Sequence, residues 1–382
     1  MMKRIIIAPD SFKESLDAQH AAAAIAAGFQ NVFPALEMIL IPMADGGEGM
    51  VRTLVDGTGG RLLKNRVTGP LGRPVDACWG ILGDEQTCVI EMAAASGLPL
   101  VPPQERNPMI TTTYGTGELI RHALATNCKR IIVGIGGSAT NDGGAGMAQA
   151  LGARLLDADG REIGYGARGV GTLFCLDIGQ MDPRLKDVDI TVAVDVKNPL
   201  CGPNGASYVY APQKGATPEM LPVLDEILRH YAKIIQRDLK INVADVPGSG
   251  AAGGLGAGLL AFLGADAKPG IDVVLDVVGM EAVLQSGVDL VVTGEGEINQ
   301  QTAFGKVPVG VARLAQKHGV PVVALVGSIG EGARAVLDCG IDAYFSLVPR
   351  PMTLSECMEH AEALLTDLAE QCARMLQAFW AE

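Results

Sequence analysis

The chain has 382 residues, 48% of them hydrophobic and 19% charged, so it is long enough for two domains and too apolar to be disordered throughout. Its formal net charge of −13 disfavours nucleic acids and anionic membranes as partners, although a small anionic substrate can still meet a locally positive pocket. Glycine supplies 49 residues, well above its usual share of about 7%, and forms no collagen-like repeat or low-complexity tract, which predicts tight turns or close approach of backbone to a ligand.

The cysteines and the first residues indicate a reduced, cytoplasmic protein. None of the eight cysteines forms a CxxC pair, so we expect them to be small buried side chains. The first residues, MMKRIIIAPD, contain an apolar run too short for a signal peptide, and no apolar stretch is long enough to span a membrane.

Strands and helices are predicted to alternate at both ends of the chain. In the first sixty residues we expect strands at 3–8 and 36–42, and helices at 15–29 and 48–55. In the last third we expect strands at 288–293, 321–326 and 342–347, and helices at 306–318, 331–338 and 354–379. This alternation predicts an α/β fold with a parallel sheet covered by helices on both faces.

The middle of the chain is richer in glycine and proline, and its strands are less regular. We therefore predict a discontinuous doubly wound domain, residues 1–65 with 286–382, interrupted by an inserted glycine-rich α/β or α+β domain at 66–285. A cleft between the two domains is the expected ligand site.

The sequence RIIVGIGGSATNDGGAG (130–146) predicts a strand, then a glycine-rich turn, then a helix. The stretch Gly134–Ala139, with Asp157 further on, fits a loose dinucleotide fingerprint, but GSGAAG at 248–253 fits it too without a preceding strand. Thr140 or Asn141 can cap the following helix, which favours a nest of backbone amides for a phosphate or carboxylate. A structural turn and a dinucleotide site remain the alternatives.

Two acidic or hydroxyl-rich segments follow the first two predicted strands. In ADGGEG (44–49), Asp45 and Glu48 can either hold Mg²⁺ or form a capping box. In APDSFKES (8–15), Ser11 and Glu14 also have capping-box spacing, and Lys13 in the first helical turn would oppose the helix dipole. This mismatch makes Lys13 a candidate for binding an anionic substrate.

Polar groups also follow two later strands. Asp195 ends the strand expected at 188–194, where a general base would be useful, and Lys197 and Lys214 in the following loops can meet phosphate. After the strand at 288–293 come Glu295, Asn299, Gln301, Thr302 and Lys306. Carboxylate, amide and ammonium groups in one segment suit phosphoryl transfer.

Other catalytic classes lack their motifs. The five scattered histidines cannot build a zinc site, no GxSxG elbow supports a Ser-His-Asp triad, and neither a P-loop nor the protein-kinase motifs occur.

Taken together, the motifs resemble those of the bacterial glycerate kinase family of the 2-kinase type. The matching strings occur in order along nearly the whole chain: APDSFKES, PMADGGEG, EMAAASGL, TYGTGELI, GIGGSATNDGGAGMAQALG, DVKNPLCGPNGA, PQKGA, GSGAAGGLGAG and TGEGEINQQTAFGKVPVGVA. The resemblance implies a flavodoxin-like domain interrupted by a second α/β domain. It also implies a kinase that uses ATP and Mg²⁺ to phosphorylate D-glycerate, with 2-phosphoglycerate as the product.

The expected site residues follow from this resemblance and from the motifs. Asp195 would accept the hydroxyl proton, Lys13 and Lys306 would act in catalysis, and Ser11, Lys13 and Asn198 would bind the substrate. Phosphate or nucleotide would be bound by Gly136, Gly137, Ser138, Thr140, Asn141, Asp142, Gly143 and Lys214. The metal candidates are Asp45, Glu48 and Glu295.

One position departs from the family pattern TGEGxxDxQ, because this chain has Asn299 where the family usually has Asp. If that Asp binds metal or accepts the proton, activity should be reduced, whereas a positioning role would make the change mild. Two alternative functions are therefore kept: an NAD-dependent hydroxyacid dehydrogenase, and a glycerate- or nucleotide-binding sensor with weakened catalysis.

Overall fold

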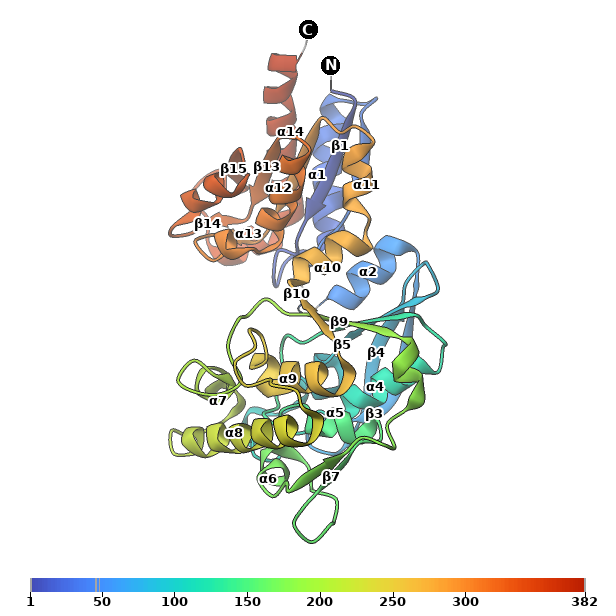
Figure 1. Cartoon of the computed structure of the whole chain (residues 1–382). Coiled ribbons are helices and arrows are strands. Elements are labelled where there is room, and N and C mark those ends of the chain that lie inside the picture. The colour runs from blue at the N-terminus through green and yellow to red at the C-terminus, as the bar shows by residue number, and fades with distance from the viewer. Residues whose placement is uncertain (1, 45–46, 48, 381–382) are drawn as a thin grey trace. The chain divides into compact units, whose positions relative to one another are not determined.

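The computed structural model describes residues 2–44, 47 and 49–380, and the chain divides into two compact units (Figure 1). The first unit comprises residues 1–45 with 271–382, and the second comprises residues 46–270. The predicted boundaries at 65/66 and 285/286 differ from these. Strand β3 (Arg61–Thr68) belongs to the second unit because it pairs along its whole length with β4 (Pro74–Ile81). Helix α10 (Gly270–Val277) belongs mainly to the first, where Ile271 packs against Gly310.

The first unit contains a five-stranded, fully parallel sheet in the order β15-β13-β11-β1-β2. Counted along this unit the order is 2-1-3-4-5, which is common in open α/β sheets. The strands are β1 (Arg4–Pro9), β2 (Glu37–Leu40), β11 (Leu290–Gly294), β13 (Val322–Val326) and β15 (Ala343–Ser346). The expected parallel α/β architecture is confirmed.

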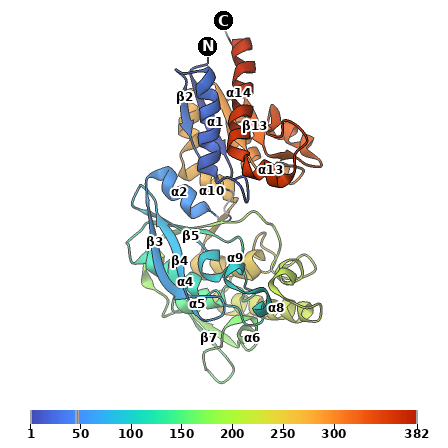
Figure 2. The ribbon, with the colours of Figure 1, turned by 180° about the vertical axis from the view of Figure 1, so that it is seen from behind.

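Helices cover both faces of this sheet. Helix α1 (Ala18–Val32) and helix α14 (Ala361–Trp380) lie side by side over one face (Figure 2), where a Cβ on Gly28 would lie 2.4 Å from the carbonyl oxygen of Thr366. Ile5, Ile7 and Phe29 belong to the core beneath them. The remaining elements are α11 (Met280–Gln285), the two-residue strands β12 (Glu297–Ile298) and β14 (Ser328–Ile329), α12 (Val307–Lys317) and α13 (Leu354–Glu359).

Two helix predictions in this unit need correction. The segment expected as a helix at 331–338 is a 3-10 helix, Ala333–Cys339, bounded by Gly332 and Gly340 in the left-handed conformation. The helix expected at 354–379 is interrupted at His360, which ends α13 before α14 begins.

The second unit is built on a six-stranded mixed sheet in the order β10-β9-β6-β5-β4-β3. The parallel part consists of β5 (Thr87–Glu91), β6 (Arg130–Gly134), β9 (Asp189–Ala193) and β10 (Asp266–Lys268). A separate hairpin pairs β7 (Arg154–Leu156) with β8 (Cys175–Asp177). The helices are α2 (Met50–Thr58), α3 (Ala93–Ser96), α4 (Tyr114–Leu124), α5 (Ala145–Ala150), α6 (Gly166–Val170), α7 (Ala206–Tyr210), α8 (Met220–Leu239) and α9 (Ala251–Leu263).

No helix in the described part of the chain is both long and apolar enough to cross a membrane.

Candidate functional site

The first unit holds a pocket of about 390 Å³ beyond the carboxyl ends of β1 and β11. These strands are neighbours, with Pro9 opposite Gly294, and the order of the sheet reverses between them. Ligands of open α/β sheets bind at such reversal points, because the loops on either side diverge and leave a crevice. The lining includes Ser11, Lys13, Glu295 and Lys306, so the structure brings four of the predicted site residues together.

Lys13 lies in a tight turn and not in a helix, which corrects the predicted capping box of Ser11 and Glu14. Phe12 and Leu16 form an antiparallel bridge across the turn, and Glu14 adopts a left-handed φ of 63°. Helix α1 begins only at Ala18, where the Asp17 side chain accepts a hydrogen bond from the amide of His20. Lys13 is exposed and forms no ion pair within the described residues, so its ammonium group is available to an anion.

Glu295 is the buried carboxylate of this pocket. Its Oε1 accepts a 2.6 Å hydrogen bond from the hydroxyl of Thr302, and its Oε2 lies 3.7 Å from Nζ of Lys306. Lys306 immediately precedes α12, and Glu295 immediately follows β11. The arrangement places one negative and one positive group beside each other beyond the carboxyl end of β11.

Asn299, the position that departs from the family pattern, lies at the rim of the same pocket. Its Nδ2 donates a 2.6 Å hydrogen bond to Oε1 of Glu297, and its Oδ1 accepts one from the amide of Gln301. A carboxylate at position 299 could not make the first contact, because both groups would then be acceptors.

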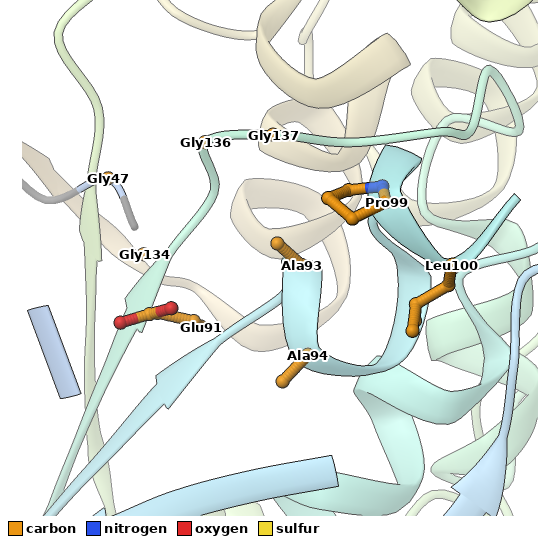
Figure 3. Close-up of a pocket in the computed structure, with 9 residues that line it drawn as sticks. All are labelled: Gly47, Glu91, Ala93, Ala94, Pro99, Leu100, Gly134, Gly136 and Gly137. Atoms are coloured by element: carbon orange, nitrogen blue, oxygen red, sulfur yellow. The ribbon is translucent and has the colours of Figure 1, made fainter. Parts of the chain in front are cut away.

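The second unit holds a smaller pocket of about 230 Å³ beyond the carboxyl ends of β5 and β6 (Figure 3). Gly136 and Gly137 form one side of it, Ala93, Ala94, Pro99 and Leu100 form another, and Glu91 also lines it. Gly137 has a φ of +71°, which a residue with a side chain adopts only at a cost. Of the predicted phosphate-binding loop, these two glycines are the exposed residues.

The rest of the predicted phosphate-binding loop is buried. Ser138, Thr140, Asn141, Asp142 and Gly143 are all inaccessible or nearly so, and Lys214 is only 1% exposed. Nζ of Lys214 donates to Oγ of Ser138 and to the carbonyl oxygen of Thr140, both at 2.7 Å. Burial lowers the pKa of Lys214 to about 7, against the opposing effect of the Asp142 carboxylate. These contacts hold the shape of the loop.

The side chain that accepts hydrogen bonds at the start of the following helix is Asp142, which corrects the prediction that Thr140 or Asn141 caps that helix. Its carboxylate accepts hydrogen bonds from the amide and hydroxyl of Thr113, and from the amides of Gly144 and Gly146. Helix α5 begins only at Ala145. Burial raises the pKa of Asp142, whereas the hydrogen bonds from Thr113, Gly144 and Gly146 lower it.

Three glycines of the segment 248–258, namely Gly253, Gly254 and Gly258, pack against this loop. A Cβ on Gly253 would lie 1.9 Å from the carbonyl oxygen of Thr140, and a Cβ on Gly258 would lie 2.6 Å from that of Gly143. Ala252, Gly253 and Gly254 all have left-handed backbone conformations. Close backbone packing therefore accounts for the glycines at these positions.

The segment after β9 holds the two remaining predicted residues of this unit. Asp195 is exposed, and its Oδ1 accepts a 2.8 Å hydrogen bond from the amide of Gly270. The Asn198 side chain donates to the carbonyl oxygen of Asn204 and accepts from the hydroxyl of Tyr210. Both polar ends of Asn198 thus stabilise the loop itself.

The metal candidates divide into two groups. Asp45 and Glu48 lie outside the described residues, whereas Glu295 lies in the pocket of the first unit. Among residues 2–44, 47 and 49–380, no three His, Cys, Asp or Glu side chains are grouped so as to hold a metal ion by themselves.

The geometry disfavours the dinucleotide alternative. In a dinucleotide fold the helix begins within the glycines, but here five residues separate Ala139 from α5. Asp157 follows the hairpin strand β7, which is not part of the main sheet, and its carboxylate accepts from the amides of Asp159 and Arg161 in a turn.

Sequence reasoning missed the apolar side of the first pocket and Glu91 of the second. Leu347 follows β15, and Leu354 and Met358 belong to α13. The Thr353 and Glu356 side chains form a capping box, a spacing visible in the sequence that fixes the start of α13. The sequence contains no comparable signal that these side chains face Lys13.

Comparisons with known proteins give one consistent family. A sequence model of the glycerate kinase family matches residues 5–377. A glycerate kinase from Bacillus subtilis (strain 168) is 54% identical, covering 98% of each chain, and a glycerate 2-kinase from Escherichia coli (strain K12) is 52% identical, covering 94% of each. A crystal structure named provisionally as a glycerate kinase 2, from Salmonella typhimurium LT2, superimposes with a TM-score of 0.89 at 50% identity and 98% coverage of each chain.

Proposed function

Because the chain belongs to the glycerate kinase family, we propose that it transfers the γ-phosphoryl group of ATP to the 2-hydroxyl group of D-glycerate, giving 2-phosphoglycerate and ADP. The observation that carries the proposal is the pocket in which Lys13, Lys306 and Glu295 converge beyond the paired ends of β1 and β11. Phosphoryl transfer requires little covalent work from a protein, but it requires positioning and neutralisation of the phosphate charge. Two ammonium groups in one pocket supply that neutralisation.

The donor set is compatible with Mg²⁺ that arrives with the nucleotide. Mg²⁺ keeps several water ligands and is usually held by one or two carboxylates together with substrate phosphates, so a single buried carboxylate suffices. Glu295 would hold the ion, which would neutralise charge on the transferred phosphoryl group. Thr302 fixes the orientation of that carboxylate by its hydrogen bond.

Asp195 is the proposed acceptor of the hydroxyl proton. Its carboxylate is exposed at the end of β9, and the hydrogen bond from the amide of Gly270 orients it. A carboxylate in this position can take up the proton as the phosphorus–oxygen bond forms.

The reaction is tested by incubating the protein with D-glycerate and MgATP, and separately with NAD. We expect ADP and a phosphoglycerate whose phosphorus resonance identifies the 2-isomer. Formation of NADH without ADP would instead support the dehydrogenase alternative, and binding without any product would support the sensor.

The Asp195→Asn variant tests the proton acceptor, since Asn keeps the hydrogen bond to Gly270 but cannot accept a proton. We expect kcat to fall by roughly 10²–10⁴-fold with nearly unchanged binding of both substrates. Asp189→Asn, at the opposite end of the same strand, is the matched control. Near-normal turnover of Asp195→Asn would remove this residue from the role.

A further inference from the structure

Two chemically different sets of residues line the pocket of the first unit, and we call them its polar and apolar walls. One wall is polar and contains Ser11 and Lys13 after β1, Glu295 after β11, and Lys306 before α12. The other wall is apolar and contains Leu347, Leu354 and Met358. A three-carbon hydroxy acid has no hydrophobic surface that could use the second wall.

Leu354 is the most informative residue of the apolar wall. It is the first residue of α13, and 76% of its surface is exposed although it lines a pocket. A ligand that covered this side chain would gain free energy, because apolar area is stabilised when it is removed from water. A flat heteroaromatic base is a ligand that would cover it.

A hydrogen bond from a side chain links the two walls. The hydroxyl of Ser15 donates a 3.0 Å hydrogen bond to the carbonyl oxygen of Met358, which links the Lys13 turn to α13. Hydrogen bonds between Phe12 and Leu16 close the same turn. The pocket is therefore preformed on both sides, as is usual for small-molecule sites.

The pocket of the second unit is less suited to a nucleotide. It is smaller, about 230 Å³ against about 390 Å³. The lysine that contacts the adjacent loop at 136–143, Lys214, is buried. Its side chain donates two hydrogen bonds to that loop. Gly136 and Gly137 contribute backbone to the pocket but no charge.

We infer that the first-unit pocket binds the nucleotide, with the base against Leu347, Leu354 and Met358 and the phosphates toward Lys13 and Lys306. This inference rests on the proposed phosphoryl transfer and deepens it by assigning the nucleotide subsite. It differs from the expectation that the loop at 136–143 cradles the phosphates and that Ser11 and Lys13 hold the glycerate carboxylate.

The test measures equilibrium binding of ADP and of pyrophosphate, which has no base, by titration calorimetry. In Leu354→Ser we expect the Kd for ADP to rise roughly fivefold to tenfold, with the Kd for pyrophosphate and the KM for D-glycerate nearly unchanged. In Lys13→Met we expect both ADP and pyrophosphate to bind roughly tenfold more weakly. Leu337→Ser, at another exposed leucine of the same unit outside the pocket, is the control and should leave all three constants unchanged.

Two results would overturn the inference. One is an unchanged Kd for ADP in Leu354→Ser, whether or not the KM for D-glycerate rises. The other is an equal loss of ADP and pyrophosphate binding in that variant, which would indicate altered pocket shape instead of a lost base contact. Failure of the proposed reaction is a separate outcome, because it would appear as wild-type protein that binds ADP but transfers no phosphoryl group.

Discussion

Nζ of Lys214 lies 2.7 Å from Oγ of Ser138, and both side chains are buried. The same ammonium group donates to the carbonyl oxygen of Thr140, so one lysine holds two points of the glycine-rich loop. This contact connects the sequence motif PQKGA to a loop more than seventy residues earlier in the chain.

The first prediction concerns the pH dependence of stability that Lys214 contributes. Burial lowers its pKa from 10.5 to about 7, so between these values the unfolded chain retains a proton that the folded chain has released. Stability increases with pH wherever the unfolded state binds more protons. We expect the free energy of unfolding to increase less between about pH 7 and pH 10.5 in Lys214→Met than in the wild type.

Urea unfolding at several pH values in that window measures this difference. Lys233→Met, at an exposed position on α8, should show the slope of the wild type. Identical slopes for wild type and Lys214→Met would contradict the assigned pKa.

The second prediction concerns Asp142, whose carboxylate accepts four hydrogen bonds in a buried position. In Asp142→Asn the amide nitrogen would face at least one N–H donor, which leaves buried donors unpaired. We expect the free energy of unfolding to fall by about 3 kcal/mol. Asp157→Asn, which also loses acceptor capacity but in a surface turn, should cost below about 1 kcal/mol. An equal fall in the free energy of unfolding in the two variants would show that burial of the Asp142 carboxylate does not increase the cost.

The third prediction separates backbone conformation from close packing at glycine. Gly253 (φ +67°) and Gly264 (φ +61°) share a left-handed conformation, but only at Gly253 would a Cβ collide with a carbonyl oxygen. We expect Gly264→Ala to cost about 1–2 kcal/mol and Gly253→Ala to cost considerably more, with loss of soluble protein as the extreme. Thermal unfolding of both variants provides the comparison, and equal melting temperatures would show that the packing is not tight.

The fourth prediction concerns the charge of Glu295. Glu295→Gln can still accept the hydrogen bond of Thr302 but loses the negative charge beside Lys306. We expect kcat to fall roughly tenfold to hundredfold and the apparent requirement for Mg²⁺ to increase, with little change in melting temperature. Glu281→Gln, at an exposed residue of α11, is the control. An unchanged Mg²⁺ titration for Glu295→Gln would argue that this carboxylate does not meet the metal.

Several features were predictable because they depend on local patterns. The alternation of apolar strands and amphipathic helices predicted the parallel α/β architecture, and the motif strings predicted the glycerate kinase family, which the comparisons show. The placement of Lys13 and Glu295 beyond strand ends followed from the same patterns, because parallel strands bring their carboxyl ends to one edge of a sheet.

Other features were not apparent from the motifs. Capping-box spacing at Ser11 and Glu14 suggested a helix start, but the bridge between Phe12 and Leu16 makes a turn there. Lys214 was expected to meet phosphate, yet it is enclosed by the loop it holds. The second result could not follow from spacing along the chain, because it depends on which remote segments pack around Lys214.

The glycine content shows the same division. By itself the sequence established the fold class, the family and an excess of glycine concentrated near charged and hydroxyl side chains. Only the tertiary structure decided that Gly136 and Gly137 line a pocket whereas Gly253 and Gly258 lie against another stretch of backbone. The reason is physical: a missing Cβ permits close approach of any group, and the identity of that group is fixed only when remote segments pack together.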